Sequence, residues 1–469
     1  MSDPIIIPWW VLATLSVLAA IALVDRIFAP ATRWFFRRRV NEAIDELNTR
    51  LDLRIQPFKL TRRQSLVDQL MYDPLVIEAV DQEAKETNVP RNVVMAKAQK
   101  YAKEIVPHFS ARAYFGFGTK IARWLSQFVY RVSLGYSDDE AIRSIDPNAT
   151  VVFIMNHRSN MDYVLLTFMA SSRASLSYAV GEWARIFLLQ TIIRAMGAYF
   201  IRRDSGNELY RRVLARYVRM ATRQGVTQAV FPEGGLSRDG KLRDPRLGLI
   251  SYMIGDFDKE NDRDVVFVPV GLNYDRVIED RILTAKQEKN LTGRNFRVSL
   301  SSIAGVMSQL FWLRVKGQLY RAGYAVASFG TPISTSQYLN ANSLNFRSMS
   351  EKERFEEIEL FGAKLIDAIG AVIPAVPVAL VSHCMLKQDG SAIGELELKS
   401  KIYELISSLE SSGTYSHIPR EDRDYAVSTG LRMLTLRHII EKTGDGLYRA
   451  NPKESVLLQY YANSISHLL

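Results

Sequence analysis

The residues best suited to chemistry lie at positions 156–162, directly after five apolar residues, 151–155, that predict a buried strand. His157 leaves this strand at the edge where open α/β sheets place their sites. Asp162 stands in the first turn of the helix predicted next, with Ser159 as its expected N-cap. Residues five apart do not share a helix face, so the pair meets only if His157 lies outside the helix. A histidine held by a carboxylate keeps one tautomer, so this pair predicts a general base.

A plainer interpretation exists for the same residues. Asp162 would then only complete a capping box with Ser159, and His157 would be a surface turn residue. The spacing is short and recurs by chance, so alone it does not establish a site. The choice between the two depends on three stretches further along the chain.

The first of these is a short apolar strand, predicted at 198–201, that ends in Arg202 and Arg203. A planar guanidinium suits two-point capture of phosphate. Arginines at a strand end are ordinarily a solvated edge, so this stretch carries weight only beside the others.

The second follows the strand predicted at 228–231 and is rich in glycine, which lets the backbone come close to a ligand. Arg238 and Lys241 add positive charge to this loop. Glu233 stands at the strand tip, where it can orient a substrate hydroxyl or brace an arginine. The loop imitates a nucleotide-binding P-loop, but Leu242 stands where that motif has Ser or Thr, so nucleotide hydrolysis is not predicted.

The third is the apolar strand predicted at 265–270, which Pro269 interrupts. A proline within a strand is typical of a sheet edge. Its functional interpretation is a strand that lines a channel for an acyl chain.

The composition indicates a globular protein with an anionic partner. Hydrophobic residues make up 47% of the 469 residues and charged residues 23%, which excludes a disordered chain. The formal net charge of +10 suits nucleic acid, an anionic membrane or a phosphorylated ligand. Cys384 is the only cysteine and the six histidines are scattered, so neither a disulfide nor a metal site is predicted.

The N-terminus narrows the choice of partner to a membrane. Residues 5–24 carry no charge, and a helix of that length spans about 30 Å, the hydrocarbon core of one bilayer. Trp9 and Trp10 lie near its outer end, and the basic segment 33–39 follows its inner end. The arginines there place the rest of the chain in the cytoplasm, so we expect one transmembrane helix and no nucleic acid partner.

Beyond this anchor, helical and strand-like patterns alternate, which predicts an α/β domain with a mixed sheet flanked by helices. The strands are expected at 151–155, 177–179, 198–201, 228–231, 265–270 and 324–329. We expect four parts: the anchor and basic segment at 1–39, an N-terminal helical domain at 40–148, the α/β domain at 149–335 and a C-terminal helical region at 336–469.

Together, the four stretches resemble the four acyltransferase blocks of the glycerolipid acyltransferase superfamily, in the same order and spacing. The likeness is greatest to the membrane-bound glycerol-3-phosphate acyltransferases of bacteria and mitochondria. It rests on His157-Arg-Ser-Asn-Met-Asp-Tyr163, Phe200-Ile-Arg-Arg203 and Glu233-Gly-Gly, with Ser237, Arg238 and Gly240-Lys241. It extends over roughly residues 65–469. Leu236 stands where the family usually has arginine, and Asn160 replaces the second histidine of the first block. The chain is also shorter than the long enterobacterial members, whose appended terminal parts we expect it to lack.

This resemblance implies transfer of a fatty acyl group from acyl-CoA or acyl carrier protein to the 1-hydroxyl of sn-glycerol 3-phosphate. The product would be lysophosphatidate, made at the bacterial inner membrane on its cytoplasmic side, without a cofactor or metal. His157 is implied as general base, oriented by Asp162. The implied substrate contacts are Arg202, Arg203, Glu233, Gly234, Ser237, Arg238 and Lys241, with Gly234 near the oxyanion.

Two alternatives remain open at this point. A lysophosphatidate acyltransferase would use the same blocks on a lipid acceptor. A non-catalytic, membrane-anchored protein would keep the basic face to bind lipid or phosphate, without needing His157 and Asp162 together.

Overall fold

The computed structural model describes residues 56–170, 176–180, 196–202, 206–288 and 322–469, together with Trp9 and Ser16. Apart from those two positions, the anchor predicted at 5–24 lies outside the described residues, as do the basic segment 33–39 and Arg203. The chain divides into two compact units, Met1–Arg54 and Ile55–Leu469, and the second contains the sheet and its helices. Among the residues with a described structure, no helix combines the length and apolar character needed to cross a membrane.

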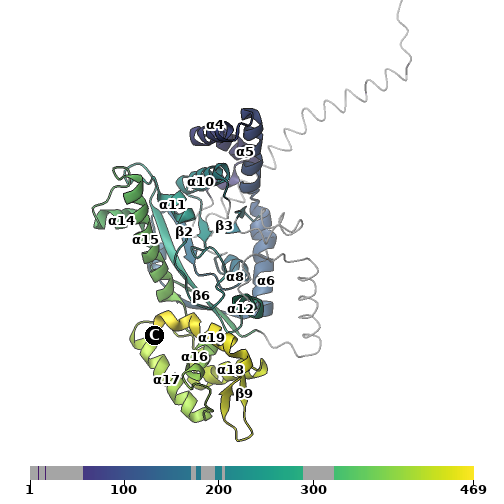
Figure 1. The fold of residues 1–469 in the computed structure, drawn as a ribbon, viewed down its shortest axis with the longest axis vertical. Coiled ribbons are helices and arrows are strands. Elements are labelled where there is room, and N and C mark those ends of the chain that lie inside the picture. The colour runs from purple at the N-terminus through teal and green to yellow at the C-terminus, as the bar shows by residue number, and fades with distance from the viewer. Residues whose placement is uncertain are drawn as a thin grey trace, which may run out of the picture. The chain divides into compact units, whose positions relative to one another are not determined.

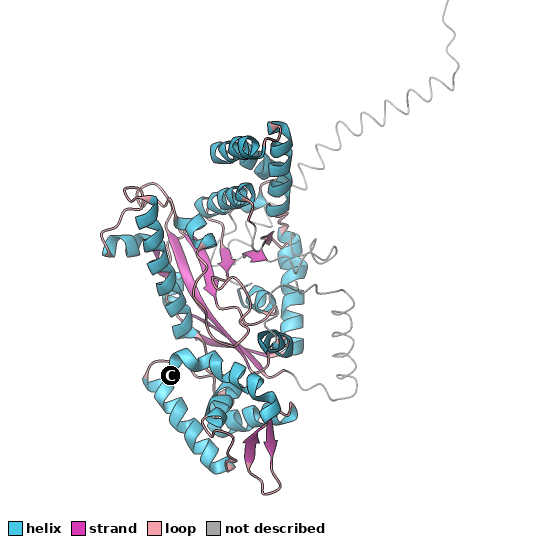
Figure 2. Cartoon of the chain, viewed as in Figure 1, coloured by secondary structure: helices cyan, strands magenta, loops and turns pink. Residues whose placement is uncertain are grey.

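At the centre of the second unit lies an eight-stranded mixed sheet, with strand order β1-β7-β6-β2-β5-β3-β4 and β8 paired to β6 (Figure 2). Strands β6, β2, β5, β3 and β4 are parallel neighbours, whereas β7 and β8 run antiparallel to β6. The strands are β1 (Arg131–Ser137), β2 (Thr150–Met155), β3 (Ser177–Val180), β4 (Tyr199–Phe200), β5 (Gln228–Val230), β6 (Val265–Tyr274), β7 (Tyr324–Phe329) and β8 (Ile333–Ser334). All six predicted strands are present, and the mixed α/β sheet is confirmed.

Two strands differ from the sequence expectation. Strand β1 lies in a region expected to be helical, and it pairs with β7 at the sheet edge. The edge position predicted for Pro269 is wrong, because β6 lies between β2 and β7. The carbonyl of Pro269 accepts a hydrogen bond from Gly330 N, just past the end of β7. The N–H that proline lacks would point to this same side, into the gap between β7 and β8, so no ladder bond is lost.

Helices precede the sheet, as the sequence predicted for this part of the chain. They are α2 (Pro57–Leu60), α3 (Arg63–Met71), α4 (Pro74–Thr87), α5 (Arg91–Ile105), the π-helical η1 (Arg112–Gly118), α6 (Thr119–Val129) and, after β1, α7 (Asp139–Arg143). Asp73 caps α4 by accepting from Leu75 N, and Pro74 stands at the first helical position, where no N–H is needed.

Helices cover both faces of the sheet (Figure 1). On one face, α10 (Glu208–Arg223), α11 (Gly248–Ile254) and α15 (Glu351–Val372) share a core with Val152, Ile154 and Phe267. On the other lie α6, α8 (Asp162–Met169) and α12 (Asp280–Glu288). A short helix, α14 (Thr335–Ala341), precedes α15, which begins with a full capping box between Ser350 and Glu353.

The C-terminal part is mainly helical, with α16 (Pro377–Leu386) packed against α17 (Glu395–Ser411), α18 (Arg423–Leu436) and α19 (Ser455–Ala462). A two-stranded hairpin, β9 (Ile440–Lys442) and β10 (Tyr448–Ala450), separates α18 from α19. Short 3-10 turns η4 (Pro419–Glu421), η5 (Pro452–Glu454) and η6 (Asn463–Leu468) complete this part.

Candidate active site

The turn between β2 and α8 brings His157 and Asp162 together. The distance from His157 Nδ1 to Asp162 Oδ2 is 2.9 Å, and both side chains are buried. His157 Nε2 is also buried and has no hydrogen-bond partner among the residues that the structure describes. Nδ1 therefore carries the proton toward the carboxylate, which leaves Nε2 as the basic nitrogen.

The turn keeps part of the predicted capping box, although the helix begins later than predicted. Helix α8 begins at Asp162, with Met161 rather than Ser159 in the N-cap position. Ser159 still makes capping contacts, because its hydroxyl accepts from Met161 N at 3.1 Å and its N–H donates to Asp162 Oδ2 at 3.0 Å. The Ser159 hydroxyl also donates to Glu279 at 2.8 Å. Two further bonds to Glu279, from the backbone and side-chain nitrogens of Asn160, fix the outer side of the turn.

Both oxygens of the Asp162 carboxylate are held by donors. Oδ2 accepts from the backbone N–H of Arg158 at 2.8 Å and of Ser159 at 3.0 Å, besides the histidine. Oδ1 accepts from the hydroxyl of Tyr274, on β6, at 2.5 Å. Burial and the adjacent Asp162 raise the pKa of Tyr274, so this hydroxyl keeps its proton and remains a donor. The carboxylate is thereby fixed in one orientation.

The backbone of His157 is clamped by the glycine-rich loop. Glu233 Oε1 accepts from His157 N at 2.7 Å, and Oε2 accepts from Arg243 N at 3.2 Å. The N–H of Ser237 donates to the carbonyl of His157 at 2.9 Å. Burial raises the pKa of Glu233 to about 7 despite these donors. The sequence suggested that Glu233 orients a substrate hydroxyl or braces an arginine side chain. In the structure its carboxylate instead holds the backbone of the His157 turn.

Arg158 faces away from Asp162 toward the C-terminal helix. Its guanidinium is buried, donates to the carbonyl of Gly240 and lies 4.9 Å from the centre of the Tyr460 ring. Gly240 has φ of +86°, and a Cβ there would lie 1.9 Å from the carbonyl oxygen of Tyr460. Asn463 Nδ2 donates to the carbonyl of Asp239 at 2.8 Å. The His157 turn, the glycine-rich loop and the C-terminal residues 460–463 are therefore in direct contact.

A cavity of about 320 Å³ opens beside His157. Its wall combines aromatic rings, aliphatic side chains and three arginines. The lining residues are His157, Tyr163, Ala179, Ile201, Arg202, Tyr210, Arg211, Leu214, Val230, Phe231, Pro232, Gly234, Arg246, Gly248, Leu249 and Tyr252. A base at one wall and positive charge at others suit an anionic substrate that carries a hydroxyl.

Of the three arginines, Arg202 was predicted and is already engaged. Its Nε and Nη2 donate to Glu104 at 2.9 and 2.6 Å, which raises its pKa. Its guanidinium also lies 4.9 Å from the Tyr101 ring and 5.2 Å from the Tyr210 ring. Arg202 therefore forms a braced, charge-compensated part of the wall.

Gly234 lines the cavity and makes room for Arg246. The φ of Gly234 is +68°, and a Cβ at this position would lie 2.5 Å from Arg246 Cδ. A side chain here would block the path of the arginine into the cavity. The N–H of Gly234 donates to the carbonyl of Phe231 at 3.0 Å, so it is not directed at a substrate oxyanion.

The other predicted contacts lie elsewhere. Arg238 and Lys241 are exposed and do not line the cavity. The hydroxyl of Ser237 is internal to its loop, where it donates to the carbonyl of Lys241 at 2.8 Å. Pro269 is in the middle of β6 and does not reach the cavity either.

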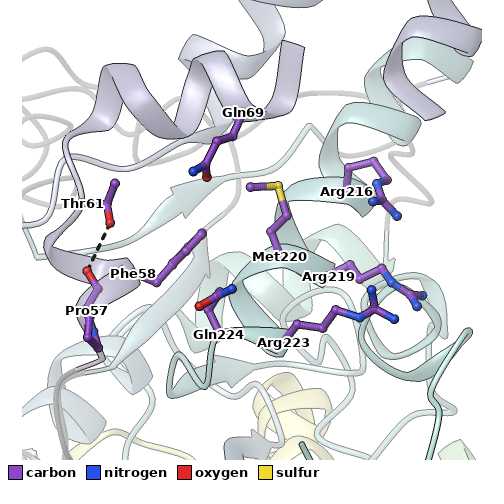
Figure 3. A pocket seen from close by; sticks show the side chains of 9 residues that line it. All are labelled: Pro57, Phe58, Thr61, Gln69, Arg216, Arg219, Met220, Arg223 and Gln224. Atoms are coloured by element: carbon purple, nitrogen blue, oxygen red, sulfur yellow. Dashed lines mark hydrogen bonds between the residues drawn. The ribbon is translucent and has the colours of Figure 1, made fainter. Parts of the chain in front are cut away.

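A second cavity, of about 330 Å³, lies between α10 and the helices α2 and α3. Figure 3 shows Arg216, Arg219 and Arg223 to one side of it and Phe58 to the other. These arginines pair with Asp73, Asp256 and Asp262 respectively. Their charges are compensated, and among the described residues no histidine, cysteine, lysine or carboxylate lines this cavity, so the His157 cavity is the stronger candidate for chemistry.

Sequence reasoning missed Arg211 and Arg246 at the cavity and Tyr274 behind Asp162. Tyr274 had a signal, because extending the β6 strand beyond residue 270 places positions 270, 272 and 274 on one face. No sequence signal placed Arg211 and Arg246 at the cavity, because both lie in polar stretches in which an arginine ordinarily faces solvent.

Comparison with known proteins shows what this chain is similar to. Residues 136–273 match the family model described as Acyltransferase, and residues 307–469 match the Glycerol-3-phosphate acyltransferase C-terminal region. A glycerol-3-phosphate acyltransferase of Pseudomonas entomophila is 26% identical over 421 residues, which are 87% of this chain and 49% of that protein. One of Pseudoalteromonas translucida is 27% identical over 425 residues, 87% of this chain and 50% of that protein.

The chain thus spans about half the length of the curated relatives it matches. Among solved structures, the 1-acyl-sn-glycerophosphate acyltransferase of Thermotoga maritima is 15% identical and covers 65% of this chain and 97% of its own. Its TM-score of 0.28 is too low to support a structural argument. The two family models match successive parts of the chain, and the first of them includes the His157 turn. The chain is thus similar to glycerol-3-phosphate acyltransferases over both of the parts that these family models match.

Proposed function

We propose that this chain transfers a fatty acyl group from acyl-CoA or acyl carrier protein to the 1-hydroxyl of sn-glycerol 3-phosphate, which yields lysophosphatidate. One observation carries the proposal: His157, whose Nδ1 is held by Asp162, lines a cavity that Arg211 and Arg246 line as well. A base and two guanidinium groups in one cavity match a substrate with a hydroxyl at one end and a phosphate at the other.

In this mechanism, His157 Nε2 takes the proton of the 1-hydroxyl as its oxygen attacks the thioester carbonyl. The bond from carbon to sulfur then breaks, and the departing thiolate takes the proton back from the imidazolium. Asp162, fixed by its four donors, stabilises the imidazolium while it lasts. The acyl group passes directly to the acceptor, so the reaction needs neither a covalent enzyme intermediate nor a cofactor.

The phosphate is assigned to Arg246 and Arg211 rather than to the loop residues Arg238 and Lys241. Arg246 crosses over Gly234 into the cavity. Arg211 is paired with Glu208 on the outer side of α10, in a contact that water already screens and that a phosphate can replace. Arg246 therefore supplies positive charge in the loop where Leu236 replaces the arginine usual in the family.

The test is an assay of the purified full chain with labelled glycerol 3-phosphate, glycerol and lysophosphatidate as acceptors, and with both acyl donors. We expect acylation of glycerol 3-phosphate, little of glycerol and little of lysophosphatidate. Preference for lysophosphatidate would instead identify an enzyme of the next acylation. Binding of glycerol 3-phosphate with no turnover on either donor would identify a non-catalytic protein.

Arg246→Ala, with Arg238→Ala as its matched control, tests the phosphate assignment. We expect Arg246→Ala to raise KM for glycerol 3-phosphate at least tenfold and to leave KM for the acyl donor nearly unchanged, because one charge-assisted pair is worth about 1.5–3 kcal/mol. Arg238→Ala removes a charge of the same kind from an exposed position and should behave as wild type. A raised KM for glycerol 3-phosphate in Arg238→Ala, with Arg246→Ala unchanged, would instead assign the phosphate to the glycine-rich loop.

We also propose that residues 5–24 cross the cytoplasmic membrane once and that the catalytic part lies on the cytoplasmic side. The support is in the sequence: a charge-free apolar run, tryptophans at one end and arginines at the other. Protease protection of a tag placed before residue 5, in sealed inside-out and right-side-out vesicles, tests the orientation.

A further inference from the structure

An apolar ridge is exposed on the outer side of η1 and α6. Phe117 is 55% exposed, Ile121 41% and Trp124 55%. The spacing of four and then three residues places them on one helix face, whereas Ala122 and Val129 on the opposite face are buried. The Trp124 ring stacks on Phe128 at 5.3 Å, which holds the indole in place on the surface. This ridge is a continuous exposed face rather than scattered single residues.

The charged residues in the sequence segment that contains the ridge all have one sign. Between Glu104 and Asp138 the sequence contains no aspartate or glutamate, while Arg112, Lys120, Arg123 and Arg131 all fall in this interval. Lys120 and Arg123 are exposed next to the ridge. Aromatic and aliphatic residues on one helix face, with lysine and arginine beside them, are the pattern of helices that lie in the headgroup region of an anionic bilayer.

The exposed residue Leu396 differs from the ridge in the charge of its neighbours. Leu396, on α17, is 83% exposed, but Glu395 and Glu397 stand on either side of it. Carboxylates at that position are repelled by an anionic surface. Charge complementarity therefore distinguishes the ridge from Leu396, and together with the exposed apolar side chains it favours a lipid surface with phosphate headgroups over a basic or neutral partner.

We propose that the ridge Phe117–Ile121–Trp124, bordered by Lys120 and Arg123, rests on an anionic phospholipid bilayer. The inference rests on the membrane attachment proposed above and adds the surface that faces the lipid. Its consequence for catalysis is positional. Helix α6 packs against α8, whose first residue is Asp162, so one helix lies between the bilayer and the catalytic turn. A lipid product would then leave next to the bilayer that accepts it.

The experiment places an environment-sensitive fluorophore on a cysteine at the ridge of the full chain. Burial raises the pKa of Cys384 to about 11, so this native thiol stays protonated and barely reacts at neutral pH. Trp124→Cys is the test position and Leu396→Cys the control. Each labelled protein is reconstituted into vesicles of phosphatidylcholine, with or without phosphatidylglycerol, that carry a spin-labelled lipid as quencher.

We expect several-fold stronger quenching at position 124 than at 396, and stronger quenching with phosphatidylglycerol than without it. Lys120→Glu in the Trp124→Cys background should reduce the effect of phosphatidylglycerol, whereas Lys352→Glu, on an exposed face of α15, should not. Equal quenching at 124 and 396, in protein that sediments with vesicles, would overturn the proposal that the ridge faces the lipid. The proposal that the protein is attached to the membrane would remain. Protein that does not sediment with vesicles would overturn both, and the acyl transfer assay would be unaffected by either outcome.

Discussion

At the scale of single residues, Asp162 both orients His157 and supplies a negative charge beside it. An amide at this position would keep the first role and lose the second. An asparagine fits the same space, because its oxygen can face the three N–H donors while its nitrogen faces the Tyr274 hydroxyl, which can turn to accept. The orientation of His157 would survive, but the negative charge that stabilises the imidazolium would be lost.

We therefore expect Asp162→Asn to lower kcat with little change in melting temperature, and His157→Ala to lower it at least as much. General-base catalysis is worth about 100- to 10,000-fold. The measurement is initial rate at saturating glycerol 3-phosphate, with His108→Ala, an exposed histidine outside the cavity, as control. A near wild-type rate in either variant would remove the pair from the mechanism.

Glu233 makes stability depend on pH. Its folded pKa of about 7 lies above its ordinary value of 4.5. Between these values the unfolded chain releases the proton and the folded chain keeps it, so rising pH favours unfolding, by about 3 kcal/mol in total. We expect the stability difference between wild type and Glu233→Gln to fall from pH 5 to pH 8. Urea denaturation at the two pH values measures it, and a constant difference would show that Glu233 does not titrate there.

At the scale of elements, α19 reaches the catalytic turn through one aromatic ring. Among the described residues the Tyr460 hydroxyl has no hydrogen-bond partner, so the ring itself makes the contact with Arg158. We expect Tyr460→Phe to match wild type. Tyr460→Leu should lower kcat by about 2- to 30-fold, since a cation–π contact is worth about 0.5–2 kcal/mol.

The KM for glycerol 3-phosphate separates positioning from substrate binding in this experiment. Tyr460 does not line the cavity, so KM should stay unchanged while kcat falls in the leucine variant. Equal loss in the phenylalanine and leucine variants would mean that the hydroxyl matters and that the contact with Arg158 does not.

The elements that the sequence predicts well are those with strong, continuous patterns. Strands β2 and β6 are apolar runs that read as buried strands. Strand β1, Arg-Val-Ser-Leu-Gly-Tyr-Ser, mixes polar and apolar residues without a clear period, because an edge strand is only partly covered. The pairing of His157 with Asp162 was predictable because both residues lie within six positions of the sequence. The cavity was not, because Arg246 and Arg211 reach it only through the packing of α10 against α11.

At the scale of the whole molecule, more than one surface is expected to face the membrane. Removal of residues 1–28 should weaken attachment without abolishing it, because the basic segment 33–39 and the ridge on α6 remain. Extraction of the shortened protein with carbonate and with high salt measures what is left. A shortened protein that is fully active and found entirely in the supernatant would make residues 1–28 the sole attachment.

The contact of Asn463 with the carbonyl of Asp239 joins residues 224 positions apart, and Tyr460 closes over Gly240 next to it. A chain folds from its N-terminal end as the ribosome makes it. The His157 turn and the glycine-rich loop are therefore complete in sequence well before the segment that fixes them has been translated. Until then, the buried face of Gly240 and the guanidinium of Arg158 stay uncovered. Under the proposed function, we therefore expect acyl transfer to begin only after the C-terminal segment has been translated and has docked on this loop.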